Sequence, residues 1–328
     1  MNTAFLDYKT VDPGDLDLSP LRKIAPNLIL HDKTAADEVN KRIQDAEIVI
    51  INKIKLDAAT ISQAKKVKLI CLVATGTDNV DLVAAKKQGI TVCNIKNYCT
   101  DSVAQHVVLS MLALSHHFDE YQVSLKQGLW QKSEQFCLLE YPITELSAKT
   151  LGIVGLGVLG TAVANLAVSF GMRVLVAESF RPESGSKNDE QQKPEFKRVS
   201  FQDLVAQSDV VSLHCPLTAE TKGLFDLRTF ETMKKNALLI NTARGGLIND
   251  EALLHALENK LIAGAALDVL DREPPAADHP LLTSGLPNLI VTPHIAWAAK
   301  EARQRSLDEI AKNIACYLKG EPRNVVTG

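Results

Sequence analysis

The stretch that decides the fold is residues 151–178, LGIVGLGVLGTAVANLAVSFGMRVLVAE. It opens with a short apolar run, Leu151–Val154, passes through a glycine-rich turn into an apolar helical pattern, and ends in a second β-type run, Arg173–Ala177. A strand, a helix and a second strand in this order form a parallel βαβ unit. The stretch therefore predicts an α/β fold.

Three glycines in this turn have the spacing of a dinucleotide-binding motif. Gly155 permits the tight turn, Gly157 lets a pyrophosphate approach the backbone, and Gly160 lets the helix pack closely on the strand. The helix N-terminus adds amide donors and a positive dipole end. Glu178 follows the second strand, where it can accept hydrogen bonds from the ribose hydroxyls and repel a 2'-phosphate. The motif predicts NAD rather than NADP, and because no Lys follows Gly160, it excludes a phosphate-binding loop of an NTPase.

Similar β-type runs alternate with helical patterns along the rest of the chain, which predicts two doubly wound parallel sheets. The strands expected in the first sheet are Ala4–Leu6, Leu28–Leu30, Ile48–Ile51, Leu69–Val73 and Thr91–Cys93. Helical patterns between them include Ala35–Asp45 and Val80–Gln88. The strands expected in the second sheet are Leu151–Val154, Arg173–Ala177, Val210–Leu213, Ala237–Ile240, Ala263–Leu267 and Leu289–Val291.

Two long helical patterns mark where the second domain begins and ends. One starts at Thr100, a candidate N-cap with Asp101 in the first turn, and the other follows Pro293 and stops at Gly320. If these helices are the crossings between domains, residues 1–99 plus 293–328 form one domain and residues 100–292 form an inserted one. The polar stretch 118–149 fits neither sheet, and its exposed aromatics predict an arm that covers a partner subunit of a homodimer.

The composition excludes several classes of protein. The chain has 328 residues, 46% hydrophobic, with 36 Lys and Arg against 39 Asp and Glu, and its charges are scattered. This balance argues against a nucleic-acid binder or a protein held on anionic lipid. Six cysteines without a C-x-x-C pair suggest neither disulfides nor a zinc site, so no metal is expected. With no signal-like N-terminus, a cytoplasmic location is the default. Thr150–Met172 lacks charges, but its glycines argue against a membrane span.

Four polar motifs follow the predicted strands of the second sheet. They are Asn241-Thr-Ala-Arg244-Gly-Gly, Ala265-Ala-Leu-Asp268, Asp271-Arg-Glu273-Pro-Pro and Val291-Thr-Pro-His294-Ile-Ala-Trp297. Since the carboxyl ends of parallel strands meet at one edge, and open α/β sheets bind ligands there, these side chains are expected to form one site.

In this ordered set of motifs the chain resembles the D-isomer-specific 2-hydroxyacid dehydrogenases over nearly its whole length. The resemblance extends to three further stretches, Leu72–Asp81, Tyr98–His106 and His214–Thr218, and within the family it is strongest to the glycerate dehydrogenase (hydroxypyruvate reductase) branch. It implies an NAD-binding Rossmann domain inserted into a flavodoxin-like substrate domain, acting on a small-molecule 2-oxo or 2-hydroxy acid.

The resemblance also implies roles that the chemistry supports. Arg244 offers a planar fork for the substrate carboxylate and keto oxygens. His294 would protonate the keto oxygen as the nicotinamide hydride arrives, and Glu273 would fix its tautomer and favour its charged form. The family pattern further implies that backbone amides around Thr75 and Gly76 hold the carboxylate.

Other contacts follow from the family pattern, some with a structural alternative. Trp297 shapes the substrate pocket or packs at a helix end, Asp268 meets the nicotinamide or caps a strand end, and His214 contacts NAD through its backbone. The remaining histidines, His106 among them, are interpreted as structural or surface groups. The expected cofactor contacts are Gly155, Gly157, Val158, Leu159, Gly160, Glu178, His214, Cys215, Pro216, Thr221, Thr242, Ala243, Arg244, Asp268 and His294.

The alternatives at this level concern the class of protein, the reaction, the substrate and the cofactor. A non-enzymatic NAD-sensing scaffold similar to corepressors is the alternative class, and it is disfavoured because the chain carries no extra terminal segment. Formate dehydrogenase is excluded by Glu273, where that enzyme should have Gln. Hydroxypyruvate and glyoxylate are favoured over pyruvate and bulkier oxo acids. Arg181, beside the polar loop Ser184–Lys197, leaves some NADP tolerance open.

Overall fold

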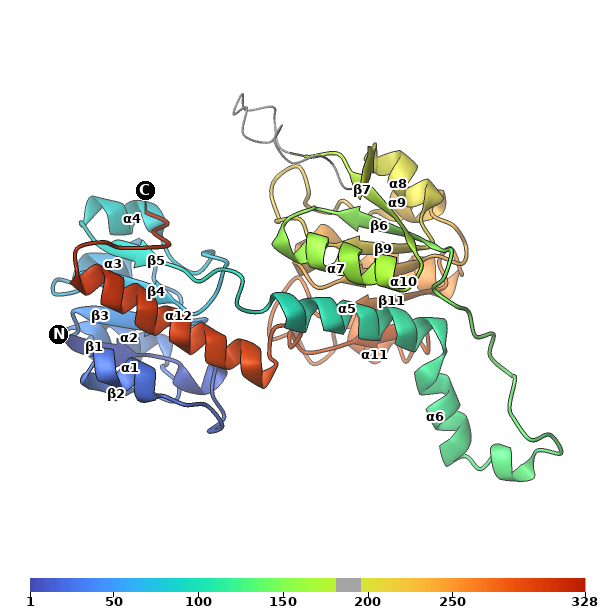
Figure 1. Cartoon of the computed structure of the whole chain (residues 1–328), viewed down its shortest axis with the longest axis horizontal. Coiled ribbons are helices and arrows are strands. Elements are labelled where there is room, and N and C mark those ends of the chain that lie inside the picture. The colour runs from blue at the N-terminus through green and yellow to red at the C-terminus, as the bar shows by residue number, and fades with distance from the viewer. Residues whose placement is uncertain (181–195, 328) are drawn as a thin grey trace. The chain divides into compact units, whose positions relative to one another are not determined.

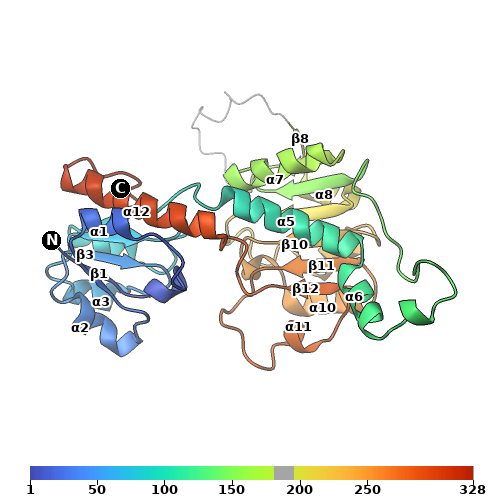
Figure 2. The ribbon, with the colours of Figure 1, turned by 60° about the horizontal axis from the view of Figure 1, so that its bottom comes forward.

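The computed structural model describes residues 1–180 and 196–327, which form two compact α/β units (Figures 1 and 2). Unit 1 consists of Met1–Cys99 and Trp297–Gly328, and unit 2 of Thr100–Ala296. Each unit is built on one parallel sheet with helices on both faces. The predicted α/β class with two parallel sheets is confirmed.

The sheet of unit 1 has the strand order β2-β1-β3-β4-β5. Its strands are β1 Asn2–Phe5, β2 Asn27–Leu30, β3 Ile48–Ile51, β4 Leu69–Leu72 and β5 Thr91–Cys93. All neighbours pair in parallel. Because helices cover both faces, the central strands β3 and β4 are buried at every position, which explains why they appear in the sequence as unbroken apolar runs.

One face of this sheet is covered by short helices, and the other face by a long helix together with one short helix. The elements are η1 Tyr8–Thr10, α1 Ser19–Ile24, η2 Ala36–Glu38, α2 Val39–Ile43, α3 Ala58–Gln63, α4 Leu82–Lys87 and α12 Lys300–Leu318. Residues of α2, α3 and α4 share one apolar cluster with the strands, while α12 contacts α1 and β4. Gly320, with φ +82°, follows the end of α12 as expected for a helix stop.

The helical pattern Ala35–Asp45 is shorter and less regular than predicted. It divides into η2 and α2, because Ala35 is extended and its N–H donates to Glu38 Oε2 at 3.0 Å, while Ala46 N–H closes a turn on Ile43 O. Val80–Gln88 is trimmed in the same way. The Asp81 side chain accepts from Ala84 N–H, so α4 begins at Leu82.

The sheet of unit 2 has the order β12-β11-β10-β9-β6-β7-β8. Its strands are β6 Thr150–Val154, β7 Arg173–Ala177, β8 Lys197–Val199, β9 Val210–Leu213, β10 Leu238–Asn241, β11 Gly264–Leu267 and β12 Leu289–Val291. All pair in parallel. The sequence missed only β8 among these, since this three-residue edge strand is mostly exposed and carries no apolar pattern.

Helices cover both faces of this sheet as well. On one face α5 Thr100–Ser115 packs on α7 Val158–Ser169, and on the other lie α8 Phe201–Gln207, α9 Leu227–Thr232 and α10 Asp250–Glu258 (Figure 1). Two shorter elements, η5 Gly245–Leu247 and α11 Pro280–Thr283, lie in the loops. The uncharged stretch Thr150–Met172 becomes the buried strand β6 and helix α7. Among the described residues, no helix has the length and apolar character needed to cross a bilayer.

The stretch 118–149 leaves the body of unit 2 as an arm, drawn in green in Figures 1 and 2. It contains α6 Phe118–Lys126 and η3 Trp130–Lys132, followed by irregular chain. Phe136 is 90% exposed and Leu139 is 80% exposed. The arm therefore presents large apolar side chains to solvent.

The chain returns to unit 1 at Trp297, four residues after the domain boundary expected at Pro293. The buried Asp268 carboxylate accepts hydrogen bonds from the N–H groups of Ile295 and Ala296, both at 2.8 Å. These bonds attach residues 293–296 to the end of β11, in unit 2. His294 consequently belongs to the same unit as Arg244 and Glu273.

Candidate active site

The predicted site residues of unit 2 gather at the carboxyl edge of its sheet. Polar or glycine-rich segments directly follow six neighbouring strands, β6, β7, β9, β10, β11 and β12. Because these strands are all parallel, the segments emerge on one side of the sheet. This edge is where the site is built.

The three glycines after β6 have different surroundings. Gly155 has φ +101°, and a Cβ there would lie 2.6 Å from Cys215 N. A Cβ on Gly160 would lie 2.2 Å from Gly155 O, so any side chain would separate helix α7 from the turn. At Gly157, apart from its neighbours along the chain, no described heavy atom lies within 4 Å of the Cβ position. Gly155 and Gly160 are thus required by packing, whereas Gly157 leaves open space.

That open space fits a pyrophosphate. Gly157 is the N-cap of α7 and has no side chain that could accept from the first N–H groups of the helix, which leaves these groups available to an anion. Val158 is 53% exposed at the helix start, and Leu159 is half-buried beside it. The residues present here fit a dinucleotide.

Glu178 directly follows β7 with an exposed side chain. Its N–H donates to Val199 O at 2.9 Å, which holds its backbone at the edge strand β8. An exposed carboxylate at this strand end can accept hydrogen bonds from a ribose. Arg181, the residue that left NADP open, lies outside the described residues.

The loop after β9 is held by its own hydrogen bonds. His214 Nε2 lies 2.9 Å from Ser212 Oγ, and burial lowers the pKa of His214 to about 4, so the ring is neutral near pH 7. Thr221 is buried, and its hydroxyl donates to Pro216 O at 2.8 Å while accepting from Thr218 N–H at 2.8 Å. Cys215 is also buried. These side chains shape the loop, which leaves its backbone as the part that can meet a cofactor.

The turn after β10 presents Arg244. The fully buried Asn241 forms it, because its side chain accepts from Ala243 N–H at 3.0 Å and donates to Arg244 O at 2.9 Å. The Arg244 side chain is exposed and donates to Ala243 O at 2.7 Å. Thr242 Oγ1 is buried with no hydrogen-bond partner within the described part of the chain. A buried hydroxyl without a partner at this edge of the sheet can take a hydrogen bond with a dinucleotide.

Gly245 brings this turn against the next one. A Cβ on Gly245 would lie 1.9 Å from Leu270 C and 2.2 Å from Asp271 N, so only glycine permits the contact. The turn that carries Arg244 therefore lies against the loop that carries Glu273. The sequence motif included Gly245 but did not predict this packing contact.

Glu273 and His294 form the central pair of the site. Glu273 Oε2 lies 2.6 Å from His294 Nδ1, and Glu273 Oε1 accepts from Leu270 N–H at 3.0 Å. The side chains are 35% and 29% exposed. His294 also has a left-handed backbone, with φ +55°. Because one ring nitrogen meets a carboxylate, the arrangement sets up Nε2 as the nitrogen that exchanges a proton with a ligand.

Asp268 makes the contacts of a strand-end cap, the structural role that the sequence offered as an alternative to a nicotinamide contact. It is 2% exposed, and both carboxylate oxygens accept hydrogen bonds from the 292–296 turn. It thus caps the strand end and anchors the turn that carries His294. The sequence offered no signal for this contact, because Asp268 and Ala296 are 28 positions apart.

The three remaining expected substrate contacts belong to unit 1. Thr75 is exposed after β4, where its hydroxyl donates to Ile95 O at 3.0 Å and its carbonyl accepts from Asn94 Nδ2 at 2.7 Å. Gly76 follows it, half-buried. Trp297 lies edge-on to Tyr98, with ring centroids 6.4 Å apart. A packing role for Trp297 is therefore visible, and its contact with substrate stays a prediction.

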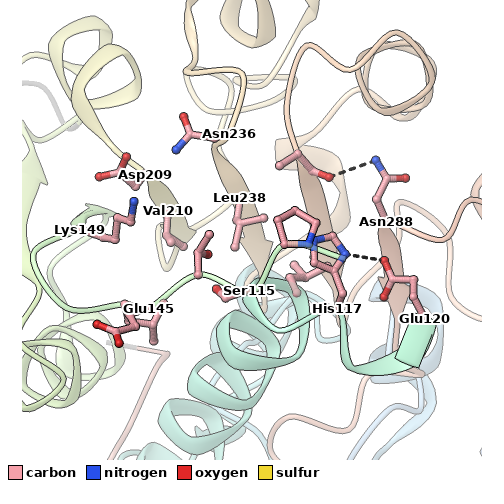
Figure 3. Close-up of a pocket in the computed structure, with 15 residues that line it drawn as sticks. Ser115, His117, Glu120, Glu145, Lys149, Asp209, Val210, Asn236, Leu238 and Asn288 are labelled. Carbon is pink, nitrogen blue, oxygen red and sulfur yellow. Dashed lines mark hydrogen bonds and ion pairs between the residues drawn. The ribbon is translucent and has the colours of Figure 1, made fainter. Parts of the chain in front are cut away.

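A cavity of about 170 Å³ lies at the opposite edge of the same sheet, at the amino ends of β9 and β10 (Figure 3). Val210 and Leu238 line it from the strands, and His117 and Glu120, 2.9 Å apart, line it from the start of α6. It contains none of the predicted site residues. It adjoins the arm and lies away from the carboxyl edge.

Comparison with known proteins gives concordant results. Residues 108–296 match the family described as D-isomer specific 2-hydroxyacid dehydrogenase, NAD binding domain. A glycerate dehydrogenase of Methylorubrum extorquens is 45% identical over 88% of this chain and 88% of its own. A hydroxypyruvate reductase of Blautia hydrogenotrophica is 36% identical over 99% of both chains. The structure of a D-lactate dehydrogenase from Aquifex aeolicus with NAD and lactic acid is similar, with a TM-score of 0.81 and 28% identity over 100% of this chain and 99% of that one.

Proposed function

Because the chain belongs to the D-isomer-specific 2-hydroxyacid dehydrogenases, NAD-dependent enzymes that reduce 2-oxo acids to D-2-hydroxy acids, we propose that its substrate is hydroxypyruvate or glyoxylate. The similarity to a glycerate dehydrogenase and a hydroxypyruvate reductase supports this choice among the 2-oxo acids. The same site would catalyse the reverse reaction, the oxidation of the D-2-hydroxy acid.

The observation that carries the proposal is the 2.6 Å contact between Glu273 Oε2 and His294 Nδ1. A carboxylate on Nδ1 keeps a hydrogen on that nitrogen and stabilises the ring when Nε2 is also protonated. His294 Nε2 then gives its proton to the keto oxygen of the substrate, and in the oxidation direction takes the proton of the hydroxyl group. Glu273 is held for this role by Leu270 N–H.

Arg244 binds the substrate. Its guanidinium is planar and always charged, and it can pair with the substrate carboxylate and keto oxygen through two N–H donors. Polarising the keto group in this way makes its carbon a better hydride acceptor. The backbone amides around Thr75 and Gly76 are the proposed partners of the substrate carboxylate.

The glycine turn and Glu178 hold the dinucleotide. When bound, NADH supplies the hydride that the protein itself cannot provide. The amides at the start of α7 would hold the pyrophosphate, and the Glu178 carboxylate would accept hydrogen bonds from the ribose hydroxyls. The backbone of His214, Cys215 and Pro216, and the Thr242–Ala243 turn, are the proposed contacts at the other strand ends.

The decisive experiment is an NADH oxidation assay over hydroxypyruvate, glyoxylate, pyruvate and a bulkier oxo acid, run in parallel with NADPH. We expect the highest kcat/KM with hydroxypyruvate or glyoxylate and a product of the D configuration. A non-enzymatic NAD-sensing scaffold would bind NADH, seen by quenching of Trp fluorescence, without oxidising it on any substrate. That outcome would refute the proposal.

We also propose a homodimer in which the arm, residues 118–149, covers a second copy of this chain through the NAD-binding unit. Phe136 and Leu139 are 90% and 80% exposed, an unfavourable arrangement for side chains left in water. In sedimentation, Phe136→Asp with Leu139→Asp should lower the dimer fraction. Val83→Asp, at a residue 80% exposed in unit 1, is the matched control and should leave it unchanged. A wild-type monomer would contradict this assignment.

The cysteines favour a reducing compartment, and we place the protein in the cytoplasm. Cys71, Cys93, Cys99 and Cys215 are buried as free thiols. Titration of the denatured protein with a thiol reagent should find every cysteine reduced.

A further inference from the structure

The turn that carries His294 has a backbone that needs support. His294 has φ +55°, a left-handed conformation that crowds the Cβ of any residue other than glycine. A hydrogen bond from its own N–H to Thr292 O, at 3.0 Å, tightens the turn further. Such a conformation persists only where surrounding contacts hold it. The position of the imidazole therefore depends on whatever anchors residues 292–296.

One buried carboxylate anchors this turn on both sides of His294. Asp268 Oδ1 accepts from Thr292 Oγ1 at 2.6 Å and from Ile295 N–H at 2.8 Å. Asp268 Oδ2 accepts from Ala296 N–H at 2.8 Å. The Asp268 side chain is 1% exposed, so these donors are the groups that stabilise its charge. Hydrogen bonds to a charged acceptor are stronger than hydrogen bonds between neutral groups.

Helix α5 holds the same turn from the other side. Ser102 Oγ donates to Ala296 O at 2.6 Å, and His106 Nε2 lies 3.1 Å from Thr292 Oγ1. The Thr292 hydroxyl has a single hydrogen, and the carboxylate of Asp268 can only accept, so this hydrogen points to Asp268. The Thr292 oxygen then accepts from His106, whose Nε2 must carry a hydrogen. The donors thus run in one direction, from His106 through Thr292 to Asp268.

We propose that Asp268, Thr292, His106 and Ser102 form a clasp that positions His294 for proton transfer, with Asp268 as the main positioning residue. Asp268 and Glu273 come from the same loop after β11, so one loop holds both the backbone of the His294 turn and its ring. This inference rests on the proposed function and assigns to Asp268 the role of holding the turn that carries His294.

Thr292 gives the sharpest variants. Thr292→Val keeps the shape of the side chain but removes the hydroxyl, while Thr292→Ser keeps the hydroxyl. Asp268→Asn removes one acceptor oxygen, so either the Ala296 bond or the pair on Oδ1 is lost. Because a small misplacement of a catalytic group can cost about 10²-fold in rate, we expect Asp268→Asn to lower kcat by about that factor and Thr292→Val by about tenfold. Thr292→Ser should restore kcat to near the wild-type value.

The readouts separate positioning from cofactor binding and from loss of stability. The dissociation constant of NADH, measured by fluorescence titration, should stay unchanged in Thr292→Val and in Thr292→Ser. Asp209→Asn is the matched control, since Asp209 also accepts a backbone N–H at a strand end of unit 2, at 2.8 Å from Thr150 N, but lies at the opposite edge of the sheet. It should lower the unfolding temperature without lowering kcat.

Two outcomes would overturn the clasp. One is a large rise in the NADH dissociation constant of Thr292→Val with kcat retained, which would mean that the turn serves cofactor binding and does not position His294. The other is an equal loss of kcat in Asp209→Asn. A further readout does not depend on activity: in protein labelled with ¹³C-histidine, the His294 ring signal, assigned with His294→Ala, should move in Thr292→Val and return in Thr292→Ser. A wild type inactive on every 2-oxo acid would refute the proposed function, and the ring signal would still test the clasp.

Discussion

Glu273 Oε2 lies 2.6 Å from His294 Nδ1, and the two residues reach this distance from loops that follow neighbouring strands, β11 and β12. In both loops, contacts with residues distant in the sequence help to position the side chain. Gly245, which has no side chain, lets the Arg244 turn pack directly on the Glu273 loop. Asp268 holds the His294 turn through hydrogen bonds. The acid–base pair is therefore a product of strand order, and its chemistry can be tested residue by residue.

Replacing the carboxylate changes the pH dependence. Glu273→Gln keeps a hydrogen-bond acceptor for Nδ1–H but removes the negative charge that stabilises the protonated ring. Reduction needs His294 protonated, so activity is present at low pH and lost as the pH rises. In the variant we expect this loss at lower pH, measured as kcat/KM for the 2-oxo acid against pH. A profile that coincides with the wild type would remove Glu273 from the mechanism.

Removing the imidazole should separate turnover from cofactor binding. His294→Ala takes away the proton donor and leaves the glycine turn after β6 untouched. We expect turnover with hydroxypyruvate or glyoxylate to fall by about two to four orders of magnitude, the usual contribution of a general acid. NADH affinity should be retained in a fluorescence titration. Near-normal turnover would contradict the assignment of His294.

Two glycines of the same turn should respond differently to one added methyl group. At Gly157 the Cβ position is open, so Gly157→Ala should fold normally but weaken NADH binding by at least about tenfold, or ~1.4 kcal/mol, because the methyl occupies the path of the pyrophosphate. At Gly160 the Cβ would lie 2.2 Å from Gly155 O, so Gly160→Ala should cost about 1–3 kcal/mol of folding stability. Urea unfolding and NADH titration of both variants give the comparison. Equal effects on binding and stability would contradict the distinction.

Cofactor choice should depend on Glu178. Its carboxylate can accept from the 2'-hydroxyl of NAD and repel the 2'-phosphate of NADP, so we expect wild-type kcat/KM to favour NADH by at least about tenfold, or ~1.4 kcal/mol. Glu178→Ala should lower NADH use and raise NADPH use. Glu231→Ala, at an exposed acid on α9, is the control for the change in net charge. Equal constants for both cofactors in the wild type would show that another residue sets the selectivity.

Asp209 should make stability depend on pH. Burial alone would raise the pKa of its carboxyl, but the Thr150 N–H and the Lys234 ammonium at 2.9 Å outweigh burial and lower it. A carboxyl with a lowered pKa stabilises the fold above its unfolded value of about 3.9, and this contribution is lost as the pH falls. Asp209→Asn should therefore cost about 1 kcal/mol at pH 7 and less than this at about pH 3, a pH below the unfolded value, where protonation of the unfolded chain offsets part of the contribution. The free energy of unfolding in urea at both pH values tests this.

The sequence by itself determined the elements whose signal is local. Buried strands such as Ile48–Ile51 and Val210–Leu213 are apolar runs between turn signals, and their bounds agree with the structure. The glycine turn after β6 and the acid after β7 are also local, since each depends on residues close together in the chain. From these, the parallel order of the strands and the gathering of the polar motifs at one sheet edge follow as consequences of the fold class.

Only the tertiary structure decided which side chains hold which turns. Nothing near Asp268 in the chain indicates that its carboxylate binds the N–H groups of Ile295 and Ala296, and nothing near Gly245 indicates its contact with Leu270. The unit boundary moved from Pro293 to Trp297 for the same reason. The edge strand β8 was missed because it depends on its strand neighbour β7, and α2 is shorter than the predicted helix because single hydrogen bonds, not a periodic pattern, set its ends. Hydrogen bonds between residues distant in the sequence are set by packing, and the periodic pattern of apolar residues does not indicate them.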